Sequence, residues 1–443
     1  MKKLYKARRV NDFDRAMRAK YSLSSLDLIA NAARGALEMM RDRLQGRKTL
    51  ILVGSGNNGA DGINLFLLMQ KEGMDVCIYY ASEGKSEENR SLRALVPPIS
   101  VSSTLCGYDV IVDAIYGASF HPPLSDDVRS LLDEVNSLSA FRAALDVPSA
   151  YYFKADLTIT FTMLKEEEVL SAHNAGRIVL FNPGFPDDEI ESYAEDSCLL
   201  EDEDYFAPSF SDVDYKNTRG HLLMKAGSPS YKGAAILSAK AAFHAGCGLV
   251  TLNADRGVRD MVYSYPPLII REGNVDYTSY SALLAGPGWG ECGNRSFLGF
   301  KGNMVLDADA LAMIEKGDDF EYRAVLTPHV GEFRRLSRRL GIGEDAVALS
   351  KALRAVVVKK SNIVEIAYSS ARYFYVGDNP SLGVAGSGDV LAGIIGAFLA
   401  SGLSPLEAAI NGVILHQMSG RKAHERLGYY DSLDLIEEVG RLR

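Results

Sequence analysis

Residues 385–393 read Ala-Gly-Ser-Gly-Asp-Val-Leu-Ala-Gly, and this stretch decides the fold of the second half of the chain. Its small residues run directly into the apolar stretch 390–400, a pattern typical of a loop that leads into a buried helix. The free amides of such a helix's first turn, at the positive end of the helix dipole, form a site for an anionic group such as a phosphate. Asp389 stands at this helix mouth, where a carboxylate can take a proton from a hydroxyl during phosphoryl transfer. A carboxylate that only stabilises the helix terminus is the alternative.

In the second half of the chain, several short apolar runs are each followed by a polar turn. Strands are predicted at 221–225, 249–253, 282–285, 304–306, 324–327 and 356–359, with an Ala-rich helix at 233–245. Three of the runs lead into Gly286-Pro-Gly-Trp-Gly290, Asp307-Ala-Asp-Ala-Leu311 and Thr327-Pro-His-Val-Gly-Glu332. Ligands bind at the carboxyl ends of parallel strands, so these turns predict a cleft that His329 faces. Trp289 fits stacking on a base and packing in the core equally well.

The first half contains a second glycine-rich loop, Gly54-Ser-Gly-Asn-Asn-Gly-Ala-Asp-Gly62, between a predicted strand at 49–53 and a helix at 62–71. Its first three glycines satisfy the GxGxxG pattern of dinucleotide-binding folds, and Glu83 lies near the end of the next strand. A tight turn that only needs small residues is the alternative. The side chains of Asn57, Asn58 and Asp61 at a helix N-terminus can hold a polar ligand or a small cation.

Two more predicted strands of the first half end in a carboxylate. Asp113 follows the run 109–112, and Asp146 is followed closely by Ser149. Each Asp alone is as consistent with a turn or a helix cap as with a binding site, but three polar strand ends in one sheet favour a pocket. With a helix at 25–40 and strands at 76–80 and 157–161, the alternation predicts a doubly wound, mostly parallel sheet.

Composition limits the class of protein. The 443 residues carry 48 Lys and Arg against 57 Asp and Glu, and a net charge of −9 argues against nucleic acid as a partner. The run 390–400 is too short to span a membrane, and the basic N-terminus lacks the apolar core of a signal peptide. Five scattered cysteines (Cys77, Cys106, Cys198, Cys247 and Cys292) predict reduced thiols in a cytoplasmic protein without a zinc site. The acidic stretch 187–204, an exposed linker or surface element, predicts a boundary between domains 1–205 and 206–443.

Residues 7–186 resemble the epimerase domain that acts on hydrated NADH and NADPH, which has a Rossmann-like fold. The resemblance rests on the glycine loop, on Val112–Gly117 (VDAIYG), on Asp146–Ser149 (DVPS), and on Thr160–Lys165 with the later Asn182–Pro186 (NPGFP). It implies that Asn58, Asp113 and Ser149 bind a potassium ion. It also implies that the substrate is lined by Asn57, Asn58, Gly59, Ala60, Asp61, Gly117, Ala118, Ser119, Phe120, His121, Pro122, Pro123 and Asp146. Asp113 and Asp146 are both candidates for the catalytic base. Ala60 and Ala150 replace family glycines, and both are predicted in tight turns.

Residues 208–443 resemble the ribokinase-like α/β dehydratase of the same repair pathway. The resemblance rests on a glycine turn at 227–235, on DADAL (307–311), on TPHVGE (327–332) and on GSGDVLAGIIGAFL (386–399). It implies that Ala234, Gly288 and His329 contact the hydrated substrate, that Asp389 drives the chemistry, and that Ser387 and Gly388 touch the nucleotide. The family's Lys-Gly-x-x-Thr nucleotide loop is altered here, since residues 358–363 lack the Gly and the Thr. Either Lys359 or Lys360 could supply the lysine.

The two resemblances together predict a fused repair enzyme. The first domain would interconvert the R and S hydrates, and the second would dehydrate the S form with ADP, or ATP, as phosphoryl donor and magnesium as its companion ion. AMP and phosphate would be the co-products, and a homo-oligomer is expected. The alternatives are a ribokinase-like kinase of a small hydroxylated vitamin, a nucleotide-binding protein with a decayed loop at 359–364, and a Rossmann dehydrogenase. A substrate screen separates them.

Overall fold

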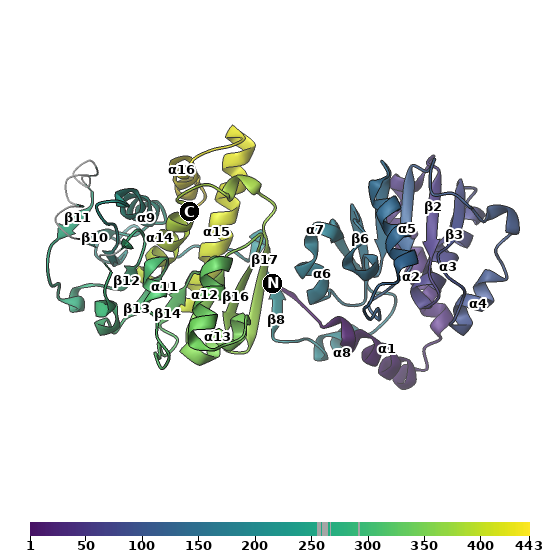
Figure 1. The fold of residues 1–443 in the computed structure, drawn as a ribbon, viewed down its shortest axis with the longest axis horizontal. Helices are drawn as coiled ribbons and strands as arrows, with labels where there is room; N and C mark the ends of the chain where they lie inside the picture. The colour runs from purple at the N-terminus through teal and green to yellow at the C-terminus, as the bar shows by residue number, and fades with distance from the viewer. Residues whose placement is uncertain (255–257, 259–264, 266, 291–292) are drawn as a thin grey trace. The chain divides into compact units, whose positions relative to one another are not determined.

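The computed structural model describes residues 1–254, 258, 265, 267–290 and 293–443. The chain forms two compact units, Lys3–Ser197 and Cys198–Arg443, the second of which also includes Met1 and Lys2. Each unit is built around its own β-sheet with helices on both faces (Figure 1). The units divide upstream of residue 205 because the chain joins the second unit's sheet early: the Leu200 amide donates a 2.7 Å hydrogen bond to the Phe374 carbonyl.

The first unit contains a six-stranded sheet in the order β3-β2-β4-β5-β6-β7, and its neighbouring strands are parallel. Its elements are α1 (Ala7–Tyr21), α2 (Ser25–Leu44), β2 (Thr49–Val53), α3 (Asn57–Lys71), β3 (Val76–Tyr80), α4 (Glu87–Arg93), η1 (Pro98–Ser100), β4 (Val110–Ala114), α5 (Asp126–Ser137), β5 (Phe141–Leu145), η2 (Ser149–Tyr151), β6 (Leu157–Phe161), α6 (Glu166–Leu170), α7 (Ala172–Ala175), β7 (Arg177–Phe181) and α8 (Asp187–Ser192). The predicted doubly wound sheet is confirmed.

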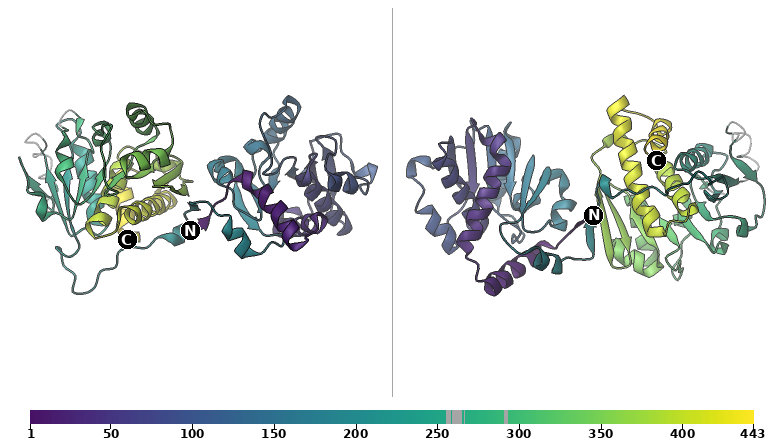
Figure 2. Two further views of the ribbon diagram at one scale, coloured as in Figure 1. Left: turned by 90° about the horizontal axis from the view of Figure 1, so that it is seen from below. Right: turned by 180° about the vertical axis from the view of Figure 1, so that it is seen from behind.

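Both faces of this sheet are covered, which explains the continuous apolar run of β2. Ile51 and Val53 pack into the cluster formed with α2 and α3, whereas Leu50 and Leu52 pack into the cluster on the α5 face. Figure 2 shows α2 lying across the first of these faces. Every residue of β2 is buried. Because successive side chains point to opposite faces, a strand covered on both sides has no polar position.

The helix after the glycine loop begins at Asn57, not at residue 62 as the sequence pattern suggested. Gly59 and Gly62 lie inside its first turns because of close contacts rather than turn geometry. A Cβ at Gly59 would lie 2.4 Å from the Gly54 carbonyl oxygen, and one at Gly62 would lie 2.5 Å from the Ala114 Cβ. Ala60 is therefore a buried helical residue, and the prediction that it lies in a tight turn is wrong.

The second unit is built on an eleven-stranded sheet in the order β1-β8-β17-β16-β15-β14-β13-β12-β9-β10-β11. Its elements are β1 (Lys2–Lys3), β8 (Ser197–Leu199), η3 (Asp202–Asp204), β9 (His221–Lys225), α9 (Lys232–His244), β10 (Leu249–Asn253), β11 (Ile269–Arg271), η4 (Tyr277–Ser279), β12 (Ala282–Ala285), η6 (Arg295–Gly299), β13 (Asn303–Leu306), α11 (Asp309–Ala312), β14 (Ala324–Leu326), α12 (Val330–Leu340), α13 (Ala346–Leu353), β15 (Val356–Lys359), β16 (Ile363–Tyr368), β17 (Ala371–Val376), η7 (Pro380–Leu382), α14 (Ser387–Ala400), α15 (Pro405–Leu427) and α16 (Ser432–Leu442). The strands from β11 to β15 are parallel, and β15, β16 and β17 are antiparallel.

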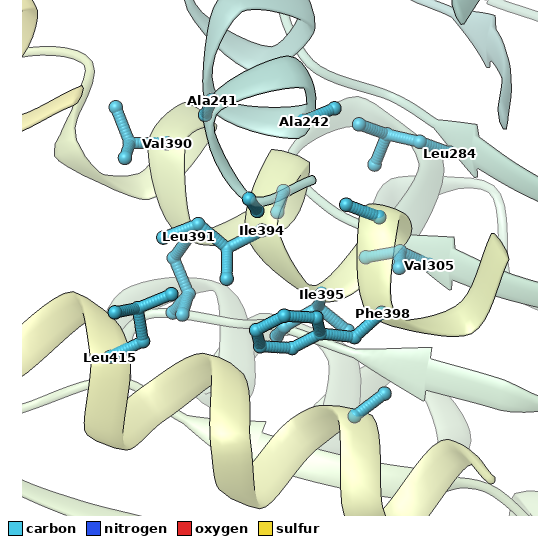
Figure 3. Close-up of a cluster of buried hydrophobic side chains, with 14 of the residues drawn as sticks. Ala241, Ala242, Leu284, Val305, Val390, Leu391, Ile394, Ile395, Phe398 and Leu415 are labelled. Atoms are coloured by element: carbon cyan, nitrogen blue, oxygen red, sulfur yellow. The ribbon is translucent and has the colours of Figure 1, made fainter. Parts of the chain in front are cut away.

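Helix α14 is the centre of this unit's core (Figure 3). All its residues from Val390 to Ala400 are buried, against α9, α15 and the strands β12 and β13. Gly393 permits the close approach of α9, because a Cβ there would lie 2.3 Å from the Ser238 carbonyl oxygen. The core thus fixes the N-terminus of α14, which carries Asp389, against the sheet.

Three further expectations concern the chain as a whole. The acidic stretch 187–204 is not a plain linker, since it contains α8, β8 and η3. Cys77, Cys106 and Cys247 are free thiols, Cys198 is buried in β8, and Cys292 lies outside the described residues. Among the helices of the described residues, none has the length and apolar character that crossing a bilayer requires.

Candidate functional sites

The first unit contains a cavity of about 480 Å³ at the carboxyl ends of its strands. Most of the predicted substrate residues line it, namely Asn57, Asn58, Asp61, Gly117, Ala118, Ser119, Phe120, His121, Pro123 and Asp146. Gly59, Ala60 and Pro122 do not. Helices α1 and α2 complete the wall with Phe13, Asp14 and Leu28, a contribution that the sequence reasoning missed.

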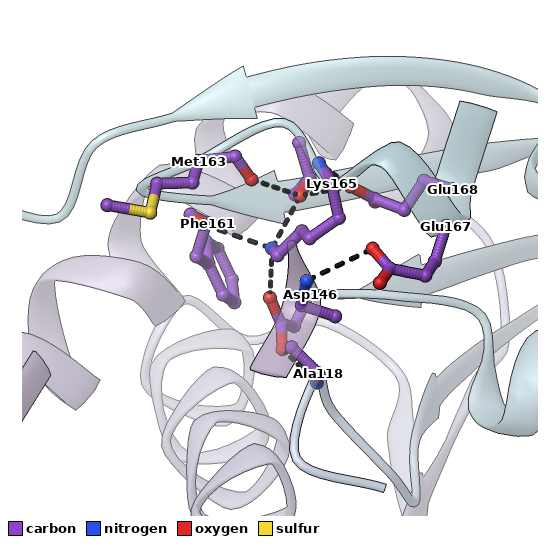
Figure 4. Close-up of polar contacts among 9 residues, drawn as sticks. Ala118, Asp146, Phe161, Met163, Lys165, Glu167 and Glu168 are labelled. Atoms are coloured by element: carbon purple, nitrogen blue, oxygen red, sulfur yellow. Dashed lines mark hydrogen bonds and ion pairs between the residues drawn. The ribbon is translucent and has the colours of Figure 1, made fainter. Parts of the chain in front are cut away.

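Asp146 is held in this cavity by two donors (Figure 4). Its Oδ1 accepts a 2.5 Å hydrogen bond from Lys165 Nζ, and its Oδ2 accepts a 2.7 Å hydrogen bond from the Ala118 amide. Lys165 is fully buried and also donates to Thr160 Oγ1 and to the Phe161 carbonyl. Gly117 is required beside this pair, since a Cβ there would lie 2.7 Å from Asp146 Oδ2. The two donors fix the direction of the Asp146 carboxyl group.

Lys165 is a site residue that the sequence reasoning did not single out. It entered only as the last residue of the segment 160–165. The available signal was a lysine a few residues after the buried strand β6, and in sequence this looks like a solvated lysine beyond a strand end.

Asp61 supplies a second carboxyl group to the same cavity. Burial raises its pKa well above the ordinary value, and the nearby carboxylates of Asp146 and Asp14 raise it further. The protonated form of Asp61 is therefore favoured in this cavity. Two neighbouring carboxyl groups, one of which favours its protonated form, can serve as a general acid and a general base.

Asp113 does not line the cavity and is fully buried. It accepts hydrogen bonds of 2.7 Å from both the amide and the hydroxyl of Ser149 and one of 3.0 Å from the Ile115 amide. Burial raises its pKa to about 6, although these hydrogen bonds act in the opposite direction. Of the two candidate bases, only Asp146 is placed to reach a substrate.

Among the three predicted potassium ligands, the Asn58 side chain is the one that makes no hydrogen bond within the described residues. The side-chain amide of Asn58 is buried, and neither its oxygen nor its nitrogen has a partner within the described residues. Carboxylate, amide and hydroxyl oxygens suit a hard cation, so Asn58, Asp113 and Ser149 fit a potassium ion. Across those same residues, no three His, Cys, Asp or Glu side chains are grouped so as to hold a metal ion.

In the second unit, the parallel strands β13, β14 and β15 bring three polar residues to one edge of the sheet. Lys360 Nζ donates a 2.9 Å hydrogen bond to Asp307 Oδ1, which also accepts a 2.8 Å hydrogen bond from Thr327 Oγ1. A Cβ at Gly388 would lie 3.2 Å from Lys360 Nζ, so the ammonium stands beside the first turn of α14. The positive charge and the helix N-terminus together form an anion site.

Asp389 lies in this first turn with its carboxyl group partly buried. Its pKa is raised to about 7, mainly by burial and also by the neighbouring Asp307, while Lys360 acts in the opposite direction. A carboxylate that titrates near neutral pH is suited to general-base catalysis.

The two candidate lysines point in different directions. Lys359 Nζ lies 3.2 Å from Glu365 Oε2 and stacks over the ring of Phe333, away from the anion site. Only Lys360 lines the adjacent cavity of about 580 Å³, together with Ser387 and Gly388.

The rest of this cavity suits a nucleotide base. Val364, Leu382 and Leu391 give it an apolar wall, and His416 Nε2 donates a 3.0 Å hydrogen bond to the Ser387 carbonyl. Burial lowers the His416 pKa to about 4, so the ring is neutral. Gln417 is buried at the cavity wall, and its Oε1 has no partner within the described part of the chain. Both residues lie inside the long helix α15, where nothing in the sequence distinguishes them from core positions.

The predicted substrate residues of the second unit occupy two places. Gly288 has a φ of 61°, and a Cβ there would lie 2.8 Å from the Ala234 Cβ, so these two are neighbours. Neither of them lines the polar cavity of about 560 Å³ that Lys225 and Trp289 help to line. Trp289 is only 5% exposed and belongs to the core cluster as well.

His329 lies at another strand end, next to Lys360. It caps α12, accepts a hydrogen bond from the Gly331 amide at Nδ1 and is exposed. Its backbone forms an isolated parallel bridge with Lys360. The predicted substrate contact therefore stands on the same edge of the sheet as the anion site.

Comparison with known proteins agrees with both units. A family model described as NAD(P)H-hydrate dehydratase matches residues 222–441, and one described as the YjeF-related protein N-terminus matches residues 25–167. The bifunctional NAD(P)H-hydrate repair enzyme Nnr of Archaeoglobus fulgidus is 28% identical over 95% of this chain and 94% of its own length. The enzyme of the same name from Escherichia coli is 26% identical over 95% and 90%.

Among solved structures, the ADP/ATP-dependent NAD(P)H-hydrate dehydratase of Bacillus subtilis, co-crystallised with ATP and Mg²⁺, is 24% identical. It covers 53% of this chain and 92% of its own, with a TM-score of 0.45. The two family models match different units, and the relatives span nearly the whole chain in one piece. The chain belongs to the family of bifunctional NAD(P)H-hydrate repair enzymes.

Proposed function

We propose that this chain restores NADH and NADPH from their hydrates with two active sites, an epimerase in the first unit and a nucleotide-dependent dehydratase in the second. The observation that supports this most directly is a pair of placed carboxyl groups, one in each unit. Asp146 is clamped by a buried lysine in one cavity, and Asp389 stands at the mouth of α14 in the other unit.

The epimerase reaction inverts the C6 carbon of the hydrate, which carries both the ring nitrogen N1 and a hydroxyl. Asp146 takes the hydroxyl proton, a C6=O bond forms, and the C6–N1 bond breaks with its electron pair going to N1. Asp61, whose protonated form is favoured by burial, donates a proton to N1. Reclosure on the opposite face of the C6 carbonyl reverses these transfers and gives the other epimer. Asp113 is not a base in this scheme because it does not reach the cavity.

Potassium would be held by Asn58, Asp113 and Ser149. When bound, it supplies a positive charge that balances the buried Asp113 and ties together the strand ends beside the substrate. The unpartnered Asn58 amide supports this role, since its oxygen is free to coordinate a cation.

The dehydratase reaction begins with phosphorylation of the C6 hydroxyl. Asp389 takes the hydroxyl proton as the oxygen attacks the β-phosphorus of ADP, and AMP leaves. Loss of phosphate from C6 with a proton from C5 then restores the C5=C6 double bond. Lys360 and the amides of Ser387 and Gly388 neutralise the transferring group. Magnesium would accompany the nucleotide phosphates, which with water supply most of its ligands.

The test is incubation of the purified chain with chemically hydrated NADH and ADP or ATP. We expect the reduced-nicotinamide absorbance to return only with nucleotide, and both epimers to be consumed. A vitamin kinase would leave the absorbance unchanged, and a non-catalytic nucleotide-binding protein would leave both hydrates intact. Homo-oligomeric assembly and a cytoplasmic location stay predictions, and light scattering of the purified chain tests the first.

A further inference from the structure

Behind the Asp146–Lys165 pair lies a second buried carboxyl group, that of Glu168 in α6 (Figure 4). Its Oε2 accepts hydrogen bonds of 2.8 Å from the Lys165 amide and 2.9 Å from Thr160 Oγ1. Thr160 Oγ1 in turn accepts a 2.7 Å hydrogen bond from Lys165 Nζ. Glu168 therefore holds Lys165 at two points. It accepts a hydrogen bond from the Lys165 backbone amide, and it is linked through Thr160 to the Lys165 ammonium.

The charges in this cluster do not balance if every group is ionised. Lys165 supplies one positive charge, whereas Asp146 and Glu168 are two carboxyl groups, and Glu168 and Lys165 are fully buried. Burial raises the Glu168 pKa to about 7, with Lys165 acting in the opposite direction and Asp146 adding to the rise.

The remaining titratable groups nearby do not neutralise Glu168. Tyr151 of η2 faces it with a buried hydroxyl that has no partner in the described residues. On α6 itself, Glu167 accepts from the Ala7 amide and Glu166 pairs with Lys6. His173 of the neighbouring α7 is exposed. Glu168 therefore changes the net charge of the cluster when it gains or loses its proton.

We propose that Glu168 is a positioning residue of the epimerase site, which fixes Lys165 behind Asp146 and whose charge sets how strongly Asp146 attracts a proton. The proposal rests on the proposed epimerase function. When Glu168 is neutral, the Lys165 ammonium has Asp146 as its one negatively charged partner in the cluster, so Asp146 is a weak base. An ionised Glu168 adds a negative charge to the cluster, so Asp146 becomes a stronger base and epimerisation speeds up.

The experiment compares the pH profiles of epimerase kcat/KM for the full chain and its Glu168→Gln and Glu167→Gln variants. Glutamine mimics the protonated carboxyl group at every pH. We expect the wild type to rise by about threefold to tenfold across pH 7, as a pKa rise of up to about one unit in a general base would produce. Glu168→Gln should match the wild type at pH 6 and stay flat to pH 8.5, whereas Glu167→Gln should follow the wild type. The proposal is overturned if Glu168→Gln loses the same fraction of kcat/KM at every pH, or if the Glu168→Gln profile still rises with pH.

A second measurement does not depend on activity. With ¹³C-labelled glutamate, the carboxyl signal that is absent in Glu168→Gln should titrate near pH 7, and Lys165→Met should move its midpoint upward. A midpoint in the ordinary glutamate range overturns the inference. A wild type that titrates as expected but does not interconvert the hydrates overturns the proposed epimerase function, and with it the role of Glu168.

Discussion

Lys360 reaches from the end of β15 across β14 to Asp307 at the end of β13, with a hydrogen bond of 2.9 Å. The same ammonium stands beside Gly388 at the N-terminus of α14. Lys359, one residue earlier, extends to the other side because successive side chains of an extended segment alternate. One residue of register thus decides which lysine stands beside the first turn of α14.

The first prediction compares Lys360→Met with Lys359→Met. Removal of the Lys360 charge should weaken ADP binding by about tenfold or more, since charge-assisted contacts to phosphate contribute about 1.5–3 kcal/mol. The Lys359 variant should bind within about threefold of the wild type because its ammonium pairs with Glu365. Calorimetric titration with ADP measures both. Equal losses in the two variants would remove Lys360 from the anion site.

The second prediction concerns Asp389 as the base of the dehydratase. Asp389→Asn should lower dehydration by about 100-fold or more, which is typical for loss of a positioned base. The epimerase lies in the other unit and should be unchanged. Because the base must be ionised and burial raises the Asp389 pKa to about 7, wild-type dehydration should rise with pH through that value. Near-normal turnover in Asp389→Asn would refute a role for this carboxylate.

The third prediction concerns the base-binding part of the nucleotide cavity. Gln417 offers an unpartnered amide oxygen to the cavity, and an amide pairs with the donor and acceptor edge of adenine. Gln417→Leu, which keeps the volume, should weaken ADP binding by about fivefold to tenfold, the worth of roughly one lost hydrogen bond. Unstable variants are recognised by their Tm. Unchanged binding of ADP by a folded variant would place the base elsewhere.

The sequence predicted the buried strands best. The ranges 49–53, 76–80, 157–161, 221–225, 249–253, 282–285 and 356–359 agree with the structure residue for residue. Most residues of these strands are buried, so apolar side chains predominate in them and mark where each strand lies. Strands β7 and β17 were not predicted, and most of their residues are only partly buried.

The candidate site was only partly readable, for a related reason. Asp146 and Asp389 each follow a strand or open a helix, and such positions can be read along the chain. Lys165, Glu168 and Gln417 gain their importance only from partners on other elements. A buried lysine has the same sequence pattern as a solvated one, and the difference between them is tertiary.

The fourth prediction concerns backbone strain at Ala150. Its φ of 55° and ψ of 17° lie in the left-handed region, which favours glycine. Ala150→Gly should therefore stabilise the first unit by about 0.5–1 kcal/mol, since a left-handed alanine costs about 1–2 kcal/mol and glycine loses part of that gain as entropy. The matched control is Ala16→Gly, at an exposed position of α1, which should destabilise by about 1 kcal/mol. Urea unfolding of both variants measures the difference, and a lower stability of Ala150→Gly would contradict the strain.

The last prediction separates Asp113 and Asp146, two aspartates of the epimerase unit. Asp146→Asn removes the group that faces the cavity, so it should lower epimerisation by about 100-fold while the R hydrate accumulates and dehydration of the S hydrate continues. Its Tm should fall as well, because two donors converge on the Asp146 carboxylate and the buried Lys165 loses its charged partner. Asp113→Asn should also lose epimerisation, but through the fold. Three donors converge on the Asp113 carboxylate, and an amide nitrogen there would leave a buried donor facing a donor, at a cost of about 1–3 kcal/mol. Potassium separates the two variants: it should raise the Tm of Asp146→Asn, which keeps the predicted ligands, and should not raise the Tm of Asp113→Asn. If Asp146→Asn interconverts the hydrates at the wild-type rate, the base of the epimerase is another residue.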